Sequence, residues 1–258
     1  HIVEFTNNAS GIIDNFVNNT TISFFENKGV IENFSGDGII YGVLNSKEIT
    51  GNFENVATSL KNTGTITGNV QLIGNQQNCG NDICITSDLI NEGIITGTFT
   101  NTAGKEMNAV QNTGVMGGIT NEGNITTINT GSITGSIANS GEITTLKVTG
   151  NVDNGITNDS NIANLTINKG VILGNSGITN NAAIGNFINN ANITYGGSGS
   201  ITGNFSNANN STITLNNDLI LNGNGNAFRN DGILKGTISN IGALSSFTNT
   251  GSITGLES

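Results

Sequence analysis

Residues 129–137 read NTGSITGSI, and this stretch decides the fold because close copies of it recur along the chain. A second version of the unit places two apolar residues three positions apart, as in ITTI at residues 125–128, and the two versions tend to alternate. Self-similarity at a short, regular interval is typical of a solenoid. Further copies of the first version are NTGTITGNV at 62–70, NEGIITGTF at 91–99, NDGILKGTI at 230–238 and NTGSITGL at 249–256.

One apolar position can be followed through these units at a mean interval of about 19 residues. Within a unit, alternate residues of a strand face opposite sides, so the aliphatic residues form a dry face and Thr, Ser and Asn form a wet one. The Asn-x-Gly segment between strands supplies residues that tolerate positive φ at a corner. The predicted column is Ile13, Ile31, Ile49, Ile66, Ile85, Met107, Ile125, Ile143, Ile162, Ile184, Ile201, Ile220 and Leu244.

These features predict an all-β fold, a parallel β-helix of about 13 coils that forms a single domain over residues 1–258. A left-handed helix of hexapeptides would place an aliphatic residue at every sixth position, and these units are longer, so we expect right-handed winding. The absence of Pro agrees, because interior strands must donate their backbone N–H groups to neighbouring coils. Asn, Thr and Ile residues stacked on their own kind should form side-chain ladders.

The composition argues against several functional classes. The chain has 8 Lys and Arg residues, 18 Asp and Glu residues and a net charge of −10, so its surface should repel nucleic acid. Its apolar runs are only a few residues long, whereas a transmembrane helix needs about 20. We therefore expect a chain that faces water.

Two segments interrupt the repeat and are predicted recognition loops, although tolerated length variation explains them as well. The first, residues 74–84, contains the only two cysteines, and we expect Cys79 and Cys84 to form a disulfide that closes the loop in an oxidising compartment. The second lies around residues 195–200. The candidate recognition residues are Gln76, Gln77, Asn78, Asn81, Asp82, Tyr195 and Ser198.

We expect no catalytic, cofactor-binding or metal-binding residues. His1 is the only histidine and lies at the chain end, which leaves no base for Ser or Cys catalysis and no partner for a zinc site. Carboxylates such as Asp82 with Asp88, or Asp153 with Asp159, could serve as an acid and base pair in a polysaccharide-active enzyme. Scattered acids on a polar face are more often simply solvated, so the enzyme hypothesis is a minor alternative.

The units quoted above resemble the passenger domains of Gram-negative autotransporters in repeat style and composition, over nearly the whole chain. The resemblance implies a right-handed β-helix that a C-terminal β-barrel translocator carries through the outer membrane, for display at the cell surface or secretion. It also implies action as an adhesin or self-associating factor, with a host-cell receptor, a glycan or like passengers as partners. The alternative is the stalk or receptor-binding part of a toxin or colonisation factor. We expect this chain to be an excised part of a longer passenger.

Overall fold

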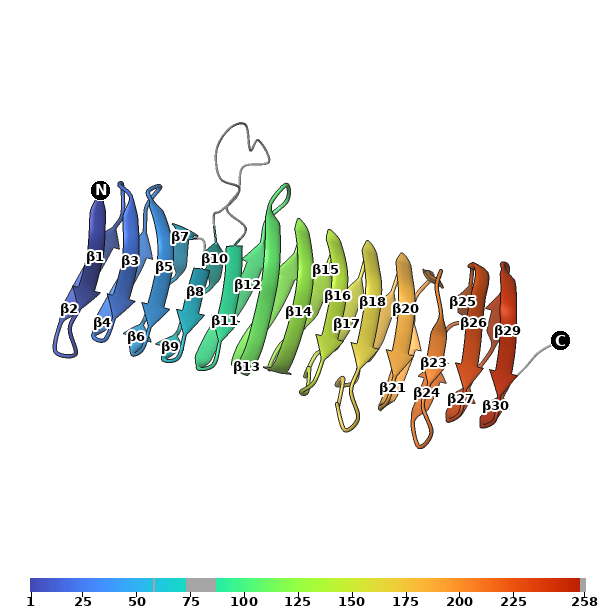
Figure 1. Cartoon of the computed structure of the whole chain (residues 1–258). Helices are drawn as coiled ribbons and strands as arrows, with labels where there is room; N and C mark the ends of the chain where they lie inside the picture. Colours follow the sequence, from blue (N-terminus) through green and yellow to red (C-terminus); the bar gives the residue numbers. More distant parts are fainter. Residues whose placement is uncertain (58, 73–86, 256–258) are drawn as a thin grey trace. The chain divides into compact units, whose positions relative to one another are not determined.

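The computed structural model describes residues 1–57, 59–72 and 87–255, and every regular element in these ranges is a β-strand. Strands pair in parallel with strands of the neighbouring coil, as the adjacent arrows of Figure 1 show. The coils contain about 19 residues each and number about 12. The structure therefore confirms the predicted parallel β-solenoid.

The chain divides into two compact units, His1–Ser132 and Ile133–Ser258. The strands of the first unit are β1 (Ile2–Asn7), β2 (Ile12–Val17), β3 (Ile22–Asn27), β4 (Val30–Ser35), β5 (Ile39–Asn45), β6 (Glu48–Ile49), β7 (Phe53–Ala57), β8 (Ser59–Asn62), β9 (Thr65–Ile66), β10 (Val70–Leu72), β11 (Ser87–Asn91), β12 (Ile94–Asn101), β13 (Glu106–Asn121) and β14 (Asn124–Ile133), which ends on the first residue of the second unit.

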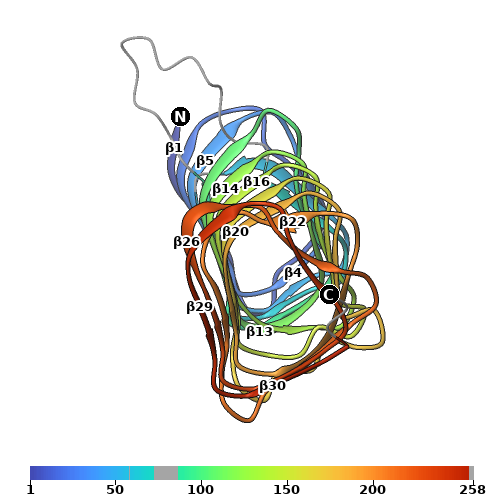
Figure 2. The same ribbon diagram turned by 90° about the vertical axis from the view of Figure 1, so that its right-hand side faces the viewer.

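The second unit has shorter strands on average. They are β15 (Ile137–Asn139), β16 (Glu142–Val148), β17 (Ile156–Asn158), β18 (Asn161–Ile167), β19 (Ile178–Asn180), β20 (Ala183–Asn189), β21 (Asn192–Gly196), β22 (Ser200–Ile201), β23 (Phe205–Asn207), β24 (Thr212–Leu215), β25 (Leu219–Leu221), β26 (Asn224–Asn230), β27 (Ile233–Lys235), β28 (Ile238–Asn240), β29 (Ala243–Asn249) and β30 (Ser252–Thr254). Viewed as in Figure 2, the backbone of each unit winds around an interior that buried side chains fill.

A column of aliphatic side chains runs through the first unit and confirms the start of the predicted column. The paired residues are Ile13, Ile31, Ile49, Ile66, Ile95 and Met116. The predicted step from Ile66 to Ile85 and Met107 is wrong. Ile66 pairs with Ile95 across an interval of 29 residues, because this coil includes residues 73–86, which lie outside the described residues, and Met107 pairs with Ser87.

The corresponding column of the second unit consists of Ile143, Ile162, Ile184, Ile201 and Leu221. The prediction is correct as far as Ile201 and one residue off at the end, since Ser200 pairs with Ile220 and Ile201 pairs with Leu221. A slip of one residue exchanges the two faces of a strand. Leu221 accordingly lies in the core, whereas Ile220 is only half-buried.

Aromatic rings form a second kind of column in each unit. In the first unit, the ring centroids of Phe16 and Phe34 lie 4.9 Å apart and those of Phe34 and Phe53 lie 4.6 Å apart. In the second unit, Phe228 stacks on Phe205 at 4.9 Å and on Phe247 at 4.5 Å, with nearly parallel planes. Each such pair contributes about 0.5–1.5 kcal/mol beyond the burial of its apolar area.

The Asn-x-Gly corners have a different physical reason from the one predicted. Gly64 and Gly93, both at this position, do not adopt positive φ. They are glycines because successive coils approach each other closely here. A Cβ on Gly93 would overlap the carbonyl oxygen of Gly64, and a Cβ on Gly64 would overlap that of Lys47. The corner therefore requires a residue without a side chain rather than one with left-handed backbone freedom.

Candidate functional site

The asparagine of each Asn-x-Gly corner in the first unit points into the interior and forms part of an amide ladder. The Nδ2 of Asn27 donates to the Oδ1 of Asn45 at 2.8 Å and to the backbone oxygen of Glu48 at 3.0 Å. The same pattern continues with distances of 2.8–2.9 Å from Asn7 to Asn112, where the hydroxyl of Thr130 accepts the last bond at 3.2 Å. The ladder residues are Asn7, Asn27, Asn45, Asn62, Asn91 and Asn112, and all are buried.

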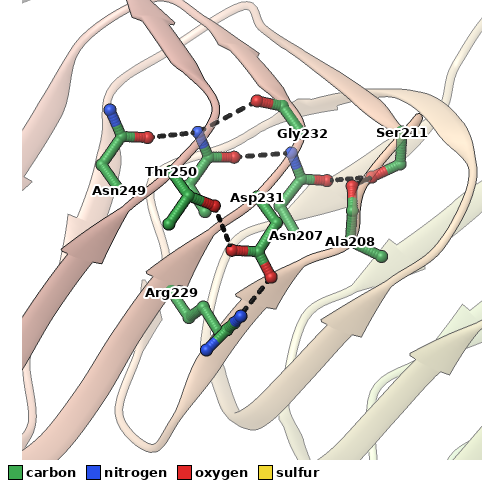
Figure 3. A network of polar contacts seen from close by, with 9 residues as sticks. Asn207, Ala208, Ser211, Arg229, Asp231, Gly232, Asn249 and Thr250 are labelled. Atoms are coloured by element: carbon green, nitrogen blue, oxygen red, sulfur yellow. Dashed lines mark hydrogen bonds and ion pairs between the residues drawn. The ribbon is translucent and has the colours of Figure 1, made fainter.

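Two amide ladders run through the second unit. In the first, Asn139 donates to Asn158 and Asn158 to Asn180, each at 2.8 Å, and Asn180 donates to the phenol oxygen of Tyr195 at 3.0 Å. The other comprises Asn189, Asn207, Asn230 and Asn249, with distances of 2.8–2.9 Å; Figure 3 shows its C-terminal part. The predicted side-chain ladders are therefore present. The amides that form them are committed to the interior and are not available to a partner.

Of the predicted recognition residues, Gln76, Gln77, Asn78, Asn81 and Asp82 lie outside the described residues, as does the predicted disulfide between Cys79 and Cys84. Tyr195 lies in β21, is 1% exposed and packs against the ring of Phe187. A side chain this deeply buried offers a partner no contact. Burial raises the pKa of Tyr195 to about 12, although the hydrogen bond with Asn180 opposes the rise. Ser198, in contrast, is exposed in the bend between β21 and β22.

The described residues contain no group of three or more His, Cys, Asp or Glu side chains that could hold a metal ion. The carboxylates named in the enzyme hypothesis have amide partners: Asn108 donates to Asp88 at 3.1 Å, and Asn181 donates to Asp159 at 2.7 Å. Asp82 lies outside the described residues. The ring nitrogen Nε2 of His1 lies 3.3 Å from the hydroxyl of Ser23 at an exposed position.

The single arginine belongs to an exposed polar network at the end of β26. The Nε of Arg229 lies 2.6 Å from Oδ2 of Asp231, and the hydroxyl of Thr250 donates to Oδ1 of the same carboxylate at 2.6 Å (Figure 3). These two contacts, the bond from Thr250 first, lower the pKa of Asp231 below its usual range. The network links two successive coils at their surface, with all of its hydrogen-bonding groups directed at one another.

A surface groove that the sequence did not predict lies in the second unit, where residues 168–177 leave the regular coil. It consists of two hollows that share Ile172 and Asn192. The first, of about 240 Å³, is lined by Ile172, Leu173, Gly174, Asn192, Ile193, Thr194, Thr212 and Thr214. The second, of about 290 Å³, is lined by Lys169, Gly170, Val171, Ile172, Asn190, Ala191, Asn192 and Asn210.

The sequence does contain a signal for this groove. Ile162 and Ile184 pair across an interval of 22 residues, longer than the usual coil, and Gly170, Gly174 and Gly177 within the interval all adopt positive φ. Extra residues with such backbone conformations indicate a loop that departs from the coil. This interval was included in the predicted column without being recognised as an insertion.

No protein-family model, curated protein or solved structure matches this chain. Within the described ranges there is also no helix of the length and apolarity that a membrane-spanning helix requires. The groove and the exposed Ser198 bend are thus the candidate recognition features that the described residues offer.

Proposed function

We propose that the chain is a surface-exposed or secreted β-solenoid passenger that acts in adhesion or cell association without catalysis. The observation that carries this proposal is the contrast between a filled interior and a regular outer face. Aliphatic columns, aromatic stacks and amide ladders occupy the inside, so contacts with a partner must use outward side chains and loops. A long, polar, repeated outer face suits many weak contacts rather than one deep site.

The outer face of the second unit shows how such contacts could be distributed. Thr157 and Thr179 occupy the same outward position on β17 and β19, and Thr194 and Thr214 do so on β21 and β24. Hydroxyl and amide groups of this kind can each donate and accept hydrogen bonds. The proposed partners are a host-cell receptor or glycan, or other copies of the same passenger.

Attachment of coated beads tests the proposal. Beads that carry the purified chain should attach to cultured epithelial cells, or to one another, several-fold more than beads that carry albumin. Soluble chain should compete with attachment to the cells. Equal attachment of both kinds of bead in both assays would contradict an adhesive or associative function.

A further inference from the structure

The groove arises from a break in the pairing of successive coils. Ile172 is held to the preceding coil, since Val152 donates its N–H to the Ile172 oxygen at 2.9 Å and Ile172 donates to Oδ1 of Asn151 at 3.0 Å. The chain then turns back on itself, with Gly177 donating to the oxygen of Leu173 at 2.9 Å. Pairing with β21 resumes only at Ile178, opposite Tyr195.

As a result, the first three residues of β21 have a regular strand partner on one side only. Asn192, Ile193 and Thr194 pair with Thr212, Ile213 and Thr214 of β24. On the other side, among the backbone hydrogen bonds of the described residues, none joins 171–176 to 192–194. The groove occupies this gap, with β21 and β24 as its floor and the Ile172–Gly174 segment as its wall.

The floor presents polar groups that the fold does not use. The hydroxyls of Thr194, Thr212 and Thr214 take part in no hydrogen bond within the described part of the chain. Asn192 accepts the N–H of Thr212 through Oδ1 at 2.9 Å, which leaves its Nδ2 as a donor. The side chain of Ile172 forms the apolar part of the wall and is 62% exposed.

The rim of the groove beyond β21 is held in place by the hydroxyl of Ser211. This hydroxyl donates to Oδ1 of Asn207 at 2.7 Å and also contacts the Ala208 oxygen, as Figure 3 shows. The short loop that it closes includes Asn210, which has φ of 63° and lines the second hollow. The loop is therefore anchored to a buried ladder, and Asn210 is positioned before any ligand arrives.

The chemistry of the lining selects among ligand classes. The first hollow has no charged residue, and Lys169 is the one charged residue of the second, so neither a metal ion nor a polyanion finds the charges that it requires. A wholly apolar ligand would cover three hydroxyls without replacing their hydrogen bonds to water, which is costly. A neutral, hydroxyl-rich ligand with an apolar face matches both the threonine floor and the Ile172 wall.

We propose that this groove binds a short segment of a neutral oligosaccharide. Its hydroxyls would exchange hydrogen bonds with Thr194, Thr212, Thr214 and Asn192, while the C–H face of a sugar ring packs against Ile172. For its role in the cell, this inference rests on the proposed adhesive function, to which it assigns a ligand class. The binding itself can be measured independently of adhesion.

Titration of the purified chain with neutral trisaccharides of glucose, galactose, mannose or N-acetylglucosamine, followed by NMR, tests the inference. We expect at least one to bind with a Kd in the millimolar range, and trigalacturonic acid to bind more weakly. The double variant Thr194→Val and Thr214→Val keeps side-chain shape and removes two hydroxyls; it should lose about tenfold in affinity, or about 1.4 kcal/mol. The matched control is Thr157→Val with Thr179→Val, an outward pair on β17 and β19 that should leave affinity unchanged.

Failure to bind any neutral trisaccharide at about 10 mM would overturn the inference, as would an equal loss in the control variant. Circular dichroism must show unchanged melting for both double variants, so that a loss of affinity reports on the groove. Beads that carry the groove variant separate the two proposals. If they adhere as well as wild-type beads, the assigned ligand class is wrong for adhesion and the adhesive function stands. If wild-type beads do not adhere although the trisaccharide binds, the adhesive function is wrong and the groove stands.

Discussion

At the scale of the residue, buried asparagine is the distinctive feature of this chain. Asparagine is a poor strand residue, and burying its amide is costly unless every group finds a partner. The ladders meet this requirement by passing each donor to the next acceptor. They fail only at their ends, where Nδ2 of Asn18 and Oδ1 of Asn101 are buried without a partner. Asn18 stacks under Gly36, and Asn101 follows Leu72, so the neighbouring coil offers neither residue a matching amide.

Substitution in the middle of a ladder should be much more damaging than substitution at the surface. Asn62→Ala would leave Nδ2 of Asn45 and Oδ1 of Asn91 without their ladder partners and should lower the free energy of unfolding by about 2–5 kcal/mol. Asn33→Ala is the control, because Asn33 forms an exposed pair with Asn15 and should cost less than about 1 kcal/mol. Urea denaturation measures both, and equal effects would contradict the role assigned to the ladder.

Tyr195 predicts a pH dependence at the alkaline end. Its pKa is raised to about 12 in the folded chain, against about 10 in the unfolded chain, so the folded state holds its proton more tightly. The resulting stability is complete below pH 10 and is lost as the pH rises through 12, at up to about 1.4 kcal/mol per unit. Comparison of urea unfolding at pH 9 and pH 11 should show a smaller decrease for Tyr195→Phe than for the wild type. An identical decrease would show that Tyr195 does not titrate as inferred.

At the scale of the element, the regular coils could be predicted and the irregular ones could not. The column Ile13, Ile31 and Ile49 follows from an interval of 18 residues and matching neighbours, and the structure confirms it. The prediction failed after Ile66 because Ile85 lies about one coil further along and imitates the repeat, while the true partner, Ile95, follows an insertion. Periodicity identifies a coil of standard length and is insensitive to an inserted loop. The groove was missed for the same reason, since a break in pairing leaves no motif.

The corner glycines allow a test of the close approach between coils. Gly93→Ala should destabilise the first unit by about 1–3 kcal/mol, because the new methyl group overlaps the Gly64 carbonyl oxygen and the backbone must shift. Gly131 occupies the same Asn-x-Gly position, but a Cβ there would lie 3.1 Å from the nearest atom, the oxygen of Asn112. Gly131→Ala should therefore cost less than Gly93→Ala in thermal unfolding. The reverse order would exclude close approach as the reason for these glycines.

At the scale of the whole molecule, the described residues present a polar outer face, and the chain carries a net charge of −10. Charged residues make up only 10% of the chain, so the repulsion between copies comes from a few unbalanced carboxylates. Surface charges more than about 10 Å apart are largely screened at 0.1 M salt. Association between copies, one of the two forms of the proposed function, must overcome this repulsion. The winding sense and the single-domain organisation stay predictions.

Salt should therefore promote association between copies. Raising the NaCl concentration from about 10 mM to about 300 mM should increase the fraction of associated chain in light scattering, because screening weakens the repulsion between like-charged surfaces. Trisaccharide binding in the uncharged part of the groove should change little over the same range. A decrease in association with added salt would point to attraction between opposite charges as the driving force.

The direction of the ladders has a consequence for how damage spreads. Every Nδ2 in the ladder of the first unit donates toward the C-terminal neighbour, so the amide dipoles point the same way and each polarises the next. Such a line behaves as one electrical object inside a medium of low permittivity. Cutting it at a single link creates two shorter lines with fresh, uncompensated poles facing each other across the cut. A point lesion would then act as a boundary, at which the stack melts as two blocks instead of one.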